Sequence, residues 1–173
     1  MQTEKVIDYI VNWLKDYATK AGVKGFVIGV SGGVDSGVVS TLCAMTGLKV
    51  LALEMPIRQQ KDQASRALEH IDFLKNKFPN VEGFTVDLNE PFEALYKTFD
   101  VKDDEFPAEK LAFANTRSRL RMLTLYYYGQ INGLLVCGTG NKVEDFGIGF
   151  YTKYGDGGVD VSPIADLYKT EVY

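Results

Sequence analysis

The sequence contains few of the residues that build disulfide frameworks or histidine metal centres. It has two cysteines and one histidine among 173 residues. Cys43 and Cys137 each lie inside an apolar segment, which favours buried free thiols over a disulfide or a zinc pair. The single histidine, His70, lies just off the apolar face of its predicted helix, and we expect a surface residue with no catalytic or ligand role.

Membrane-targeting segments and an excess of positive charge are also absent. No apolar run approaches the roughly 20 residues that cross a bilayer, and charged residues in the first turns argue against a signal peptide. Nineteen Lys and Arg against 23 Asp and Glu give a formal net charge of −4. Because the basic residues are scattered, the chain has no footprint for a nucleic-acid backbone. We therefore expect a cytoplasmic protein that binds neither membranes nor nucleic acid.

A glycine-rich stretch follows the first apolar run of the chain. Residues 26–30 have the composition of a buried parallel strand, and Val38, Val39, Leu42 and Met45 are spaced like one face of a helix. The stretch itself consists of Gly29, Val30, Ser31, Gly32, Gly33, Val34, Asp35 and Ser36. Such a turn is typical of a phosphate site, because glycines let the backbone approach an anion and the helix N-terminus adds a partial positive charge.

This stretch differs from the common P-loop, which would carry Gly and Lys where Val34 and Asp35 stand. A carboxylate beside phosphates is favourable only with a cation between them, so Asp35 predicts Mg²⁺ together with a nucleotide. The order Ser-Gly-Gly-x-Asp-Ser resembles the pyrophosphate loop of the ATP pyrophosphatases, which split ATP into AMP and pyrophosphate while adenylating a substrate. The alternative is a structural turn with Asp35 placed favourably on the helix dipole.

Apolar periodicity along the chain predicts one α/β domain over residues 1–173. We expect an open parallel sheet of about five strands with helices on both faces, Rossmann-like and similar to the adenine nucleotide alpha hydrolases. The expected strands are residues 26–30, 49–55, 83–88, 134–137 and 159–164, and the expected helices are residues 3–20, a helix ending at 45, 60–78, 91–99, 111–128 and one opening near 166. The polar stretch 100–107 is expected to be mobile. The last helix has little room to finish, so we expect the C-terminal part of the domain to be missing.

The expected helix at 111–128 is apolar around most of its circumference. A helix of this kind is usually buried on two sides, so we expect one side to face the sheet and the other to meet a second subunit in a homodimer. Its arginines point to different places. Arg117 and Arg121 share a face, whereas Arg119 is turned roughly halfway round the helix and can serve a different site.

Two further polar turns follow or precede predicted strands. Ligands of open parallel sheets bind at the carboxyl ends of the strands, so we expect these turns near the glycine-rich stretch. The turn at 138–145 offers Glu144 as a metal ligand, although Asn141 three residues earlier also gives the spacing of a capping box. The turn at 152–160 holds three glycines within residues 155–158 and by itself is also compatible with a flexible turn.

Together these stretches closely resemble the ammonia-dependent NAD synthetases. The resemblance rests on residues 31–36, 138–145, 152–160 and the pair Ser162-Pro163. Members of the family adenylate the carboxylate of nicotinic acid adenine dinucleotide (deamido-NAD) with Mg-ATP, and ammonia then displaces AMP to leave NAD. The resemblance implies an NAD synthetase ATP-pyrophosphatase domain, a carbon–nitrogen ligase of the final step of NAD biosynthesis, with Mg²⁺ as cofactor and ATP as co-substrate.

The resemblance also implies roles for particular residues. It assigns ATP contacts to Gly29–Ser36, Thr139 and Lys169, Mg²⁺ ligation to Asp35 and Glu144, deamido-NAD contacts to Arg119, Lys153 and Asp160, and catalysis to Asp35, Lys153 and Lys169. Two carboxylates suit a hard cation that bridges phosphates, and the lysines can offset phosphate charge.

Ammonia rather than glutamine is the expected nitrogen donor, because no segment resembles a glutaminase and neither cysteine has a nucleophile's surroundings. Two competing interpretations remain. One is another pyrophosphate-loop ATPase, such as a tRNA-modifying enzyme or the synthetase half of an amidotransferase, although the acidic balance disfavours tRNA. The other is a nucleotide-sensing module without turnover, which would not need the paired metal ligands Asp35 and Glu144.

Overall fold

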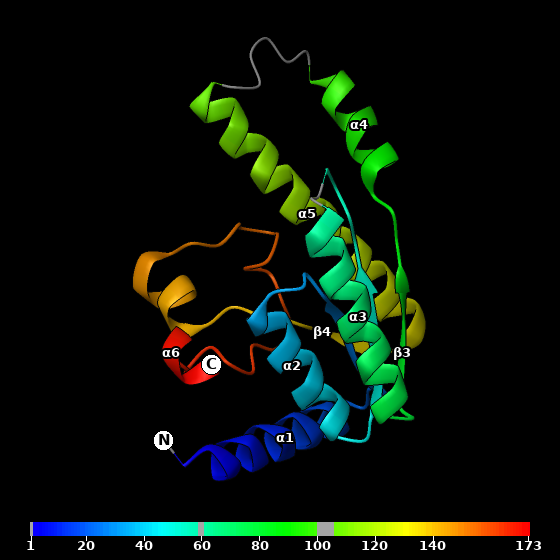
Figure 1. Cartoon of the computed structure of the whole chain (residues 1–173), viewed down its shortest axis with the longest axis vertical. Coiled ribbons are helices and arrows are strands. Elements are labelled where there is room, and N and C mark those ends of the chain that lie inside the picture. Colours follow the sequence, from blue (N-terminus) through cyan, green and yellow to red (C-terminus); the bar gives the residue numbers. More distant parts are fainter. Residues whose placement is uncertain (1, 59–60, 100–105) are drawn as a thin grey trace.

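A parallel sheet of four strands, covered by helices on both faces, forms the centre of the computed structural model (Figure 1). The structure describes residues 2–58, 61–99 and 106–173, apart from the side chains of 61–64. The predicted start of a helix at residue 60, and most of the acidic stretch expected to be mobile, lie outside these ranges. No helix in the described ranges is long and apolar enough to cross a membrane.

The order of the strands creates a switch point beside the first strand. The strands are β1 (Gly25–Gly29), β2 (Lys49–Glu54), β3 (Val81–Thr85) and β4 (Leu134–Cys137). The sheet has the order β3-β2-β1-β4, and each neighbouring pair is parallel. The chain therefore adds strands on one side of β1 and then returns to its other side. Ligands bind at the carboxyl ends of strands where the direction of winding changes, which here means the ends of β1 and β4.

Each face of the sheet carries its own group of helices. The helices are α1 (Thr3–Lys20), α2 (Val34–Met45), α3 (Lys61–Lys77), α4 (Asn89–Thr98), α5 (Pro107–Asn132) and the short α6 (Lys169–Val172). The first three pack on one face together with Val172 of α6, while α4 and α5 pack on the other. The predicted architecture of helices on both faces is confirmed.

The longest helix, α5, extends beyond the predicted residues 111–128 at both ends. Pro107 fits the first helical position because the N–H that it lacks has no partner there. Gly133 ends the helix in the left-handed conformation, with φ of 68°, which glycine adopts without strain. The helix is bound to the sheet on one side by Met122, Leu125 and Gly129, all of which are buried.

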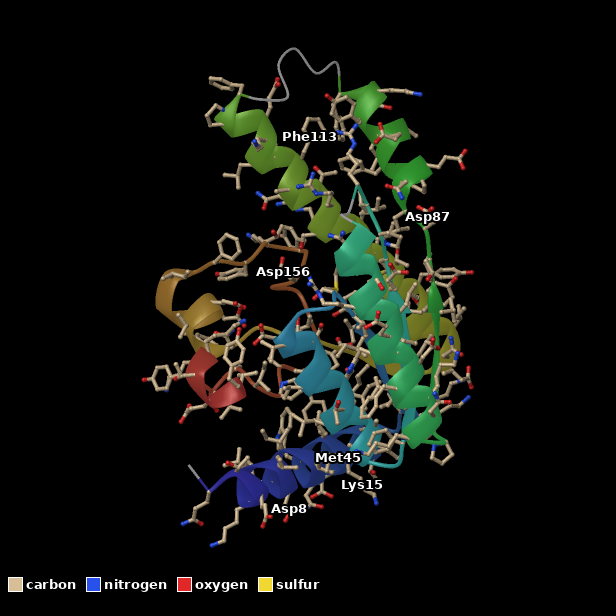
Figure 2. All side chains as sticks on the ribbon, viewed as in Figure 1. Asp8, Lys15, Met45, Asp87, Phe113 and Asp156 are labelled. Carbon is tan, nitrogen blue, oxygen red and sulfur yellow. The ribbon has the colours of Figure 1, made fainter. Side chains whose placement is uncertain are left out.

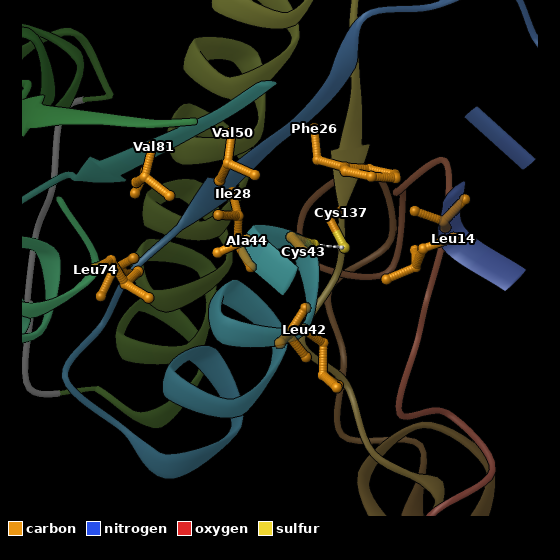
Figure 3. Close-up of a cluster of buried hydrophobic side chains, with 14 of the residues drawn as sticks. Leu14, Phe26, Ile28, Leu42, Cys43, Ala44, Val50, Leu74, Val81 and Cys137 are labelled. Atoms are coloured by element: carbon orange, nitrogen blue, oxygen red, sulfur yellow. Dashed lines mark hydrogen bonds between the residues drawn. The ribbon is translucent and has the colours of Figure 1, made fainter. Parts of the chain in front are cut away.

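Two buried clusters of apolar side chains hold these layers together. Figure 3 shows the cluster under α1, α2 and α3, which includes Leu14, Phe26 and Ile28. Cys43 and Cys137 belong to it as free thiols, with their sulfur atoms 3.4 Å apart. Burial raises the pKa of Cys137, which agrees with the predicted role of both cysteines as buried apolar residues. The second cluster includes Phe113, which projects from α5 toward α4 (Figure 2).

The predicted fifth strand at residues 159–164 is wrong. The segment forms no strand and has one isolated parallel bridge to the sheet, between Val161 and Cys137. Beside this bridge, the hydrogen bond from Val136 N is accepted by the side-chain oxygen Asp160 Oδ2, at 2.7 Å, and not by a backbone carbonyl. Pro163 then has no N–H to continue a ladder.

His70 is not the surface residue that its place in the sequence suggested. Its ring is half-buried between α3 and the start of α2, with Nε2 2.9 Å from Ser40 Oγ. Ser40 Oγ donates to the Ser36 carbonyl at 2.7 Å, so its oxygen is free to accept a hydrogen from the imidazole. Burial lowers the pKa of His70, although the Gly37 backbone opposes this shift, and the ring packs against Gly37 in the first turn of α2.

Candidate active site

The pyrophosphate loop, residues 31–36, joins β1 to α2 and is held in shape by two serine hydroxyls. Ser36 Oγ donates to the Gly33 carbonyl at 2.9 Å and accepts from Ser31 N at 3.2 Å. Gly32 has φ of 80°, a conformation that a larger residue adopts only with strain. The loop therefore turns its backbone toward the carboxyl end of the sheet, at the N-terminus of α2, where an anion binds favourably.

Three charged side chains from distant parts of the chain meet beside this loop. Lys169 at the start of α6 donates from Nζ to Asp35 Oδ2, and the same nitrogen lies 3.4 Å from Glu144 Oε1. Asp35 belongs to the first turn of α2, and Glu144 to a short π-helical segment, Val143–Ile148. Burial opposes the charge of Lys169, but the hydrogen bond and charge of Asp35, together with Glu144, outweigh it and raise the lysine pKa.

Asn141 connects the Asp35 carboxylate to the backbone of Glu144. Its side chain is fully buried, and its Oδ1 accepts from Val143 N at 3.1 Å and Glu144 N at 3.2 Å. Its Nδ2 lies 3.4 Å from Asp35 Oδ1. The capping interaction suggested by the sequence spacing is thus present from the Asn141 side, while the Glu144 carboxylate contacts Lys169. The sequence spacing predicts only the capping role of Asn141 and carries no signal for its contact with Asp35.

A small cavity of about 210 Å³ between the pyrophosphate loop and the 138–145 turn is strongly acidic. Its walls include Asp35, Glu144, Asp145 and Asp156. Burial raises the pKa of Asp145, and the charges of Asp156 and Glu144 raise it further. The Asp145 carboxylate lies against Gly140, so a β-carbon at this position would force that carboxylate to turn away. A cavity of this charge can receive phosphates only together with cations.

The carboxylate oxygens of this cavity suit an Mg²⁺ ion that is bound together with a nucleotide. The described residues contain no cluster of three or more His, Cys, Asp or Glu side chains arranged to hold a metal by themselves. Mg²⁺ usually takes only one or two carboxylates and completes its shell with water and substrate phosphates. Asp35 and Glu144 already approach one cation, the Lys169 ammonium, so their oxygens converge as such a site requires.

A larger cleft of about 1070 Å³ extends from the pyrophosphate loop across the sheet end to α5. Thr139, predicted to contact ATP, lines both this cleft and the small acidic cavity. Met55 and Ile57, which follow β2, give the cleft an apolar part, while Arg117 and Arg121 of α5 give it a cationic part. The cleft thus combines surfaces for an aromatic base and for anionic groups.

The three residues predicted to contact deamido-NAD are divided between two places. Arg119 Nε donates to the Lys153 carbonyl at 3.0 Å, so these two cations are neighbours on an exposed surface. Asp160 lies elsewhere, accepting from Tyr126 Oη at 3.0 Å as well as from β4. Burial and the Asp160 carboxylate raise the pKa of Tyr126 to about 12. Neither Arg119 nor Lys153 lines the large cleft within the described ranges, and their roles toward the substrate stay predictions.

Comparisons with known proteins agree with this geometry. A family model described as NAD synthase matches residues 6–173. The NH(3)-dependent NAD(+) synthetase of Mesoplasma florum is 40% identical over 173 residues, which cover 99% of this chain and 68% of that protein. The protein of the same name from Finegoldia magna is 38% identical over 174 residues, with 100% of this chain and 68% of that protein covered.

Solved structures show the same likeness. NMN synthetase from Francisella tularensis superposes with a TM-score of 0.87 at 35% identity, covering 99% of this chain and 68% of that one. NH3-dependent NAD synthetase from Campylobacter jejuni, in complex with nitrate, gives a TM-score of 0.87 at 31% identity, covering 99% and 71%. The chain spans about two thirds of the length of these proteins. The sequence motifs, the fold and both comparisons agree, and the chain belongs to the NAD synthase family.

Proposed function

We propose that this protein is an ammonia-dependent NAD synthetase, which converts deamido-NAD, ATP and ammonia to NAD, AMP and pyrophosphate. The observation that carries the proposal is the meeting of Asp35, Glu144 and Lys169 beside the pyrophosphate loop, at the switch point of the sheet. A sensing module would need the anion-binding loop but not two carboxylates directed at one cation. The family membership agrees with catalysis by this site.

Each part of the site has a distinct task in adenylation. The backbone N–H groups of the pyrophosphate loop and the N-terminus of α2 bind the terminal phosphates of ATP, which leaves the α-phosphorus open to attack. Asp35 and Glu144 would hold Mg²⁺, which when bound neutralises charge on the departing pyrophosphate. Lys169 lies close enough to both carboxylates to add positive charge at the same place. Of the two predicted catalytic lysines, only Lys169 touches this cluster; Lys153 lies against Tyr154, 5.1 Å from its ring centre.

The reaction needs two steps, because ammonia does not displace oxygen from a carboxylate at neutral pH. In the first step a carboxylate oxygen of deamido-NAD bonds to the α-phosphorus, and the bond from that phosphorus to the pyrophosphate breaks. In the second step ammonia attacks the carbonyl carbon, AMP leaves with the former carboxylate oxygen, and a proton is released. An acyl-adenylate thus divides one difficult step into two easier ones.

The fate of the carboxylate oxygen tests this route. With deamido-NAD labelled with oxygen-18 in its carboxylate, we expect one labelled oxygen in each AMP formed, with AMP, pyrophosphate and NAD in equal amounts. Ammonium should support the reaction and glutamine should not. Mass spectrometry of the products measures the oxygen-18 label in AMP. Release of ADP and phosphate, or AMP without label, would contradict the mechanism.

The same assay distinguishes a dinucleotide from a mononucleotide as the pyridine substrate. A relative at 35% identity is named an NMN synthetase, so the acid form of the mononucleotide competes with deamido-NAD as the natural substrate. Both substrates present the same carboxylate, and the chemistry of the site would serve either. A higher kcat/KM for deamido-NAD supports the proposal, whereas a preference for the mononucleotide would replace NAD synthesis by NMN synthesis.

We also propose that the protein works as a homodimer in the cytoplasm. Three large apolar side chains that follow one another at successive turns of α5 remain uncovered: Leu123 is 68% exposed, Tyr127 61% and Ile131 61%. A contiguous exposed surface of this kind usually marks an interface. The free thiols Cys43 and Cys137 suit a reducing compartment.

Replacing Leu123 with Asp tests the dimer. A charge in the centre of an apolar interface is poorly solvated, so we expect L123D to be largely monomeric at micromolar concentration while the wild type is dimeric. Light scattering measures the mass of both. Lys110→Gln, on the same helix, serves as the control and should leave the dimer intact. A monomeric wild type would contradict the proposal.

A further inference from the structure

Two arginines of α5, Arg117 and Arg121, form part of the wall of the large cleft. They are one helical turn apart and therefore lie on the same face of the helix. Arg121 Nε donates to the Met55 carbonyl at 3.0 Å, just beyond the end of β2. Arg117 lies over the ring of Phe92, with its guanidinium carbon 5.8 Å from the ring centre. Arg119 lies on a different face of the helix from this pair, and the pair has no task in the proposed mechanism.

The surroundings of the pair are electrostatically unfavourable in the absence of an anion. Burial lowers the pKa of Arg121, and the charge of Arg117 lowers it further. Within the described ranges, neither guanidinium forms an ion pair with a carboxylate; Arg121 donates to the Met55 carbonyl, and Arg117 lies over the Phe92 ring. Half-buried like charges without a counter-ion reduce stability, whereas they favour binding of an anion that enters between them.

We infer that Arg117 and Arg121 form a second anion subsite, which binds a phosphate group of a nucleotide substrate at the opposite side of the cleft from the pyrophosphate loop. Guanidinium groups suit this task, because their planar N–H donors match phosphate oxygens in pairs. The cleft of about 1070 Å³ has room for groups beyond the phosphates held by the loop. The inference rests on the proposed function for the identity of the nucleotides.

A phosphate fits this subsite better than the carboxylate that is adenylated. That carboxylate must attack phosphorus, and two guanidinium groups bound to its oxygens would withdraw the electron density that the attack needs. A phosphate ester of the substrate does not act as the nucleophile, so guanidinium groups can bind its oxygens without weakening the attack. Two phosphates remain as candidates: the α-phosphate next to the adenosine of ATP, and the phosphates that join the ribose groups of the pyridine nucleotide.

Direct binding measurements distinguish these sources. Arg117→Gln and Arg121→Gln are compared with the wild type by calorimetric titration of AMP in one arm and deamido-NAD in the other. Loss of one charged hydrogen-bonding contact should weaken binding by about 10- to 100-fold in the arm whose phosphate the pair holds. Arg121→Lys should restore only part of the affinity, because an ammonium lacks the paired donors. Lys110→Gln, which removes the same charge from the same helix outside the cleft, should bind both ligands as the wild type does.

Thermal melting separates ligand binding from a structural role. Removing Arg117 relieves repulsion with Arg121, so we expect the unliganded Arg117→Gln protein to melt at the wild-type temperature or above. Unchanged affinity for both ligands in both glutamine variants would overturn the inference, as would a lower melting temperature of Arg117→Gln together with weakened binding in both arms. Failure of the proposed function is a different result, since it would appear as a wild type that binds nucleotides but releases no AMP.

Discussion

Asp35→Asn and Glu144→Gln should each reduce adenylation by a factor on the order of 100 to 1000, the range for losing one preorganised contact that stabilises charge. Both carboxylates face the Lys169 ammonium beside the pyrophosphate loop, and neither belongs to a buried apolar cluster. An amide keeps the shape of each side chain but loses the negative charge that would hold Mg²⁺ in the proposed site. The measurement is the rate of AMP formation with deamido-NAD, ammonium and Mg-ATP.

The fold should survive both substitutions. The ion pairs with Lys169 are partly solvated, with Glu144 and Lys169 each 36% exposed, so the change in the free energy of unfolding should stay within about 1 kcal/mol. A role of Glu144 in capping alone predicts a loss of about 1 kcal/mol with activity retained, so retained activity is the result that distinguishes it. Activity and thermal melting of one sample decide between them. Asp8→Asn, an exposed acid on α1 far from the loop (Figure 2), is the matched control and should change neither.

Local sequence patterns predicted most of the fold because each helix and strand carries its own apolar period. The strand β4 matched the predicted residues 134–137, and α1 matched 3–20. The segment 159–164 shows the limit of this reasoning. Its alternation of Val and polar residues is typical of a strand, but Asp160 occupies the hydrogen-bonding position that a backbone carbonyl would take. Such a substitution depends on tertiary geometry, which periodicity does not encode.

The candidate site was predictable where one continuous stretch of sequence held both the loop and the predicted metal-ligating residue. The pyrophosphate loop and Asp35 are of this kind, since the loop, the strand before it and the helix after it are contiguous. The contact of Lys169 with Asp35 spans 134 residues, and only the resemblance to a known family suggested Lys169. The contact of Asn141 with Asp35 had no signal in the sequence beyond the capping spacing. His70 was misjudged because its partner, Ser40, lies on another helix.

Lys169→Met should remove most of the activity while strengthening the binding of Mg²⁺ to the nucleotide-free protein. The Lys169 ammonium occupies the place where Asp35 and Glu144 converge, and it therefore competes with any other cation for the same oxygens. Without it, two carboxylates face each other across a solvated gap, and a divalent cation relieves their repulsion. Activity should fall by a factor on the order of 100 to 1000, because the cation proposed to stabilise the reacting phosphates is lost.

The loss of activity and the stronger binding of Mg²⁺ are measured separately. The prediction can therefore fail even if the activity is lost. Thermal melting during titration with MgCl2 should show a larger stabilisation of Lys169→Met than of the wild type. A ligand that binds the native state stabilises it more as the ratio of its free concentration to its Kd rises, and the tighter site has the lower Kd. Lys15→Met, an exposed lysine on α1, should respond as the wild type does. Adding Asp35→Asn to Lys169→Met should abolish the extra stabilisation. An equal response to Mg²⁺ in Lys169→Met and wild type would show that the ammonium and the metal use different oxygens, and the assignment of Asp35 and Glu144 as a shared cation site would then fail.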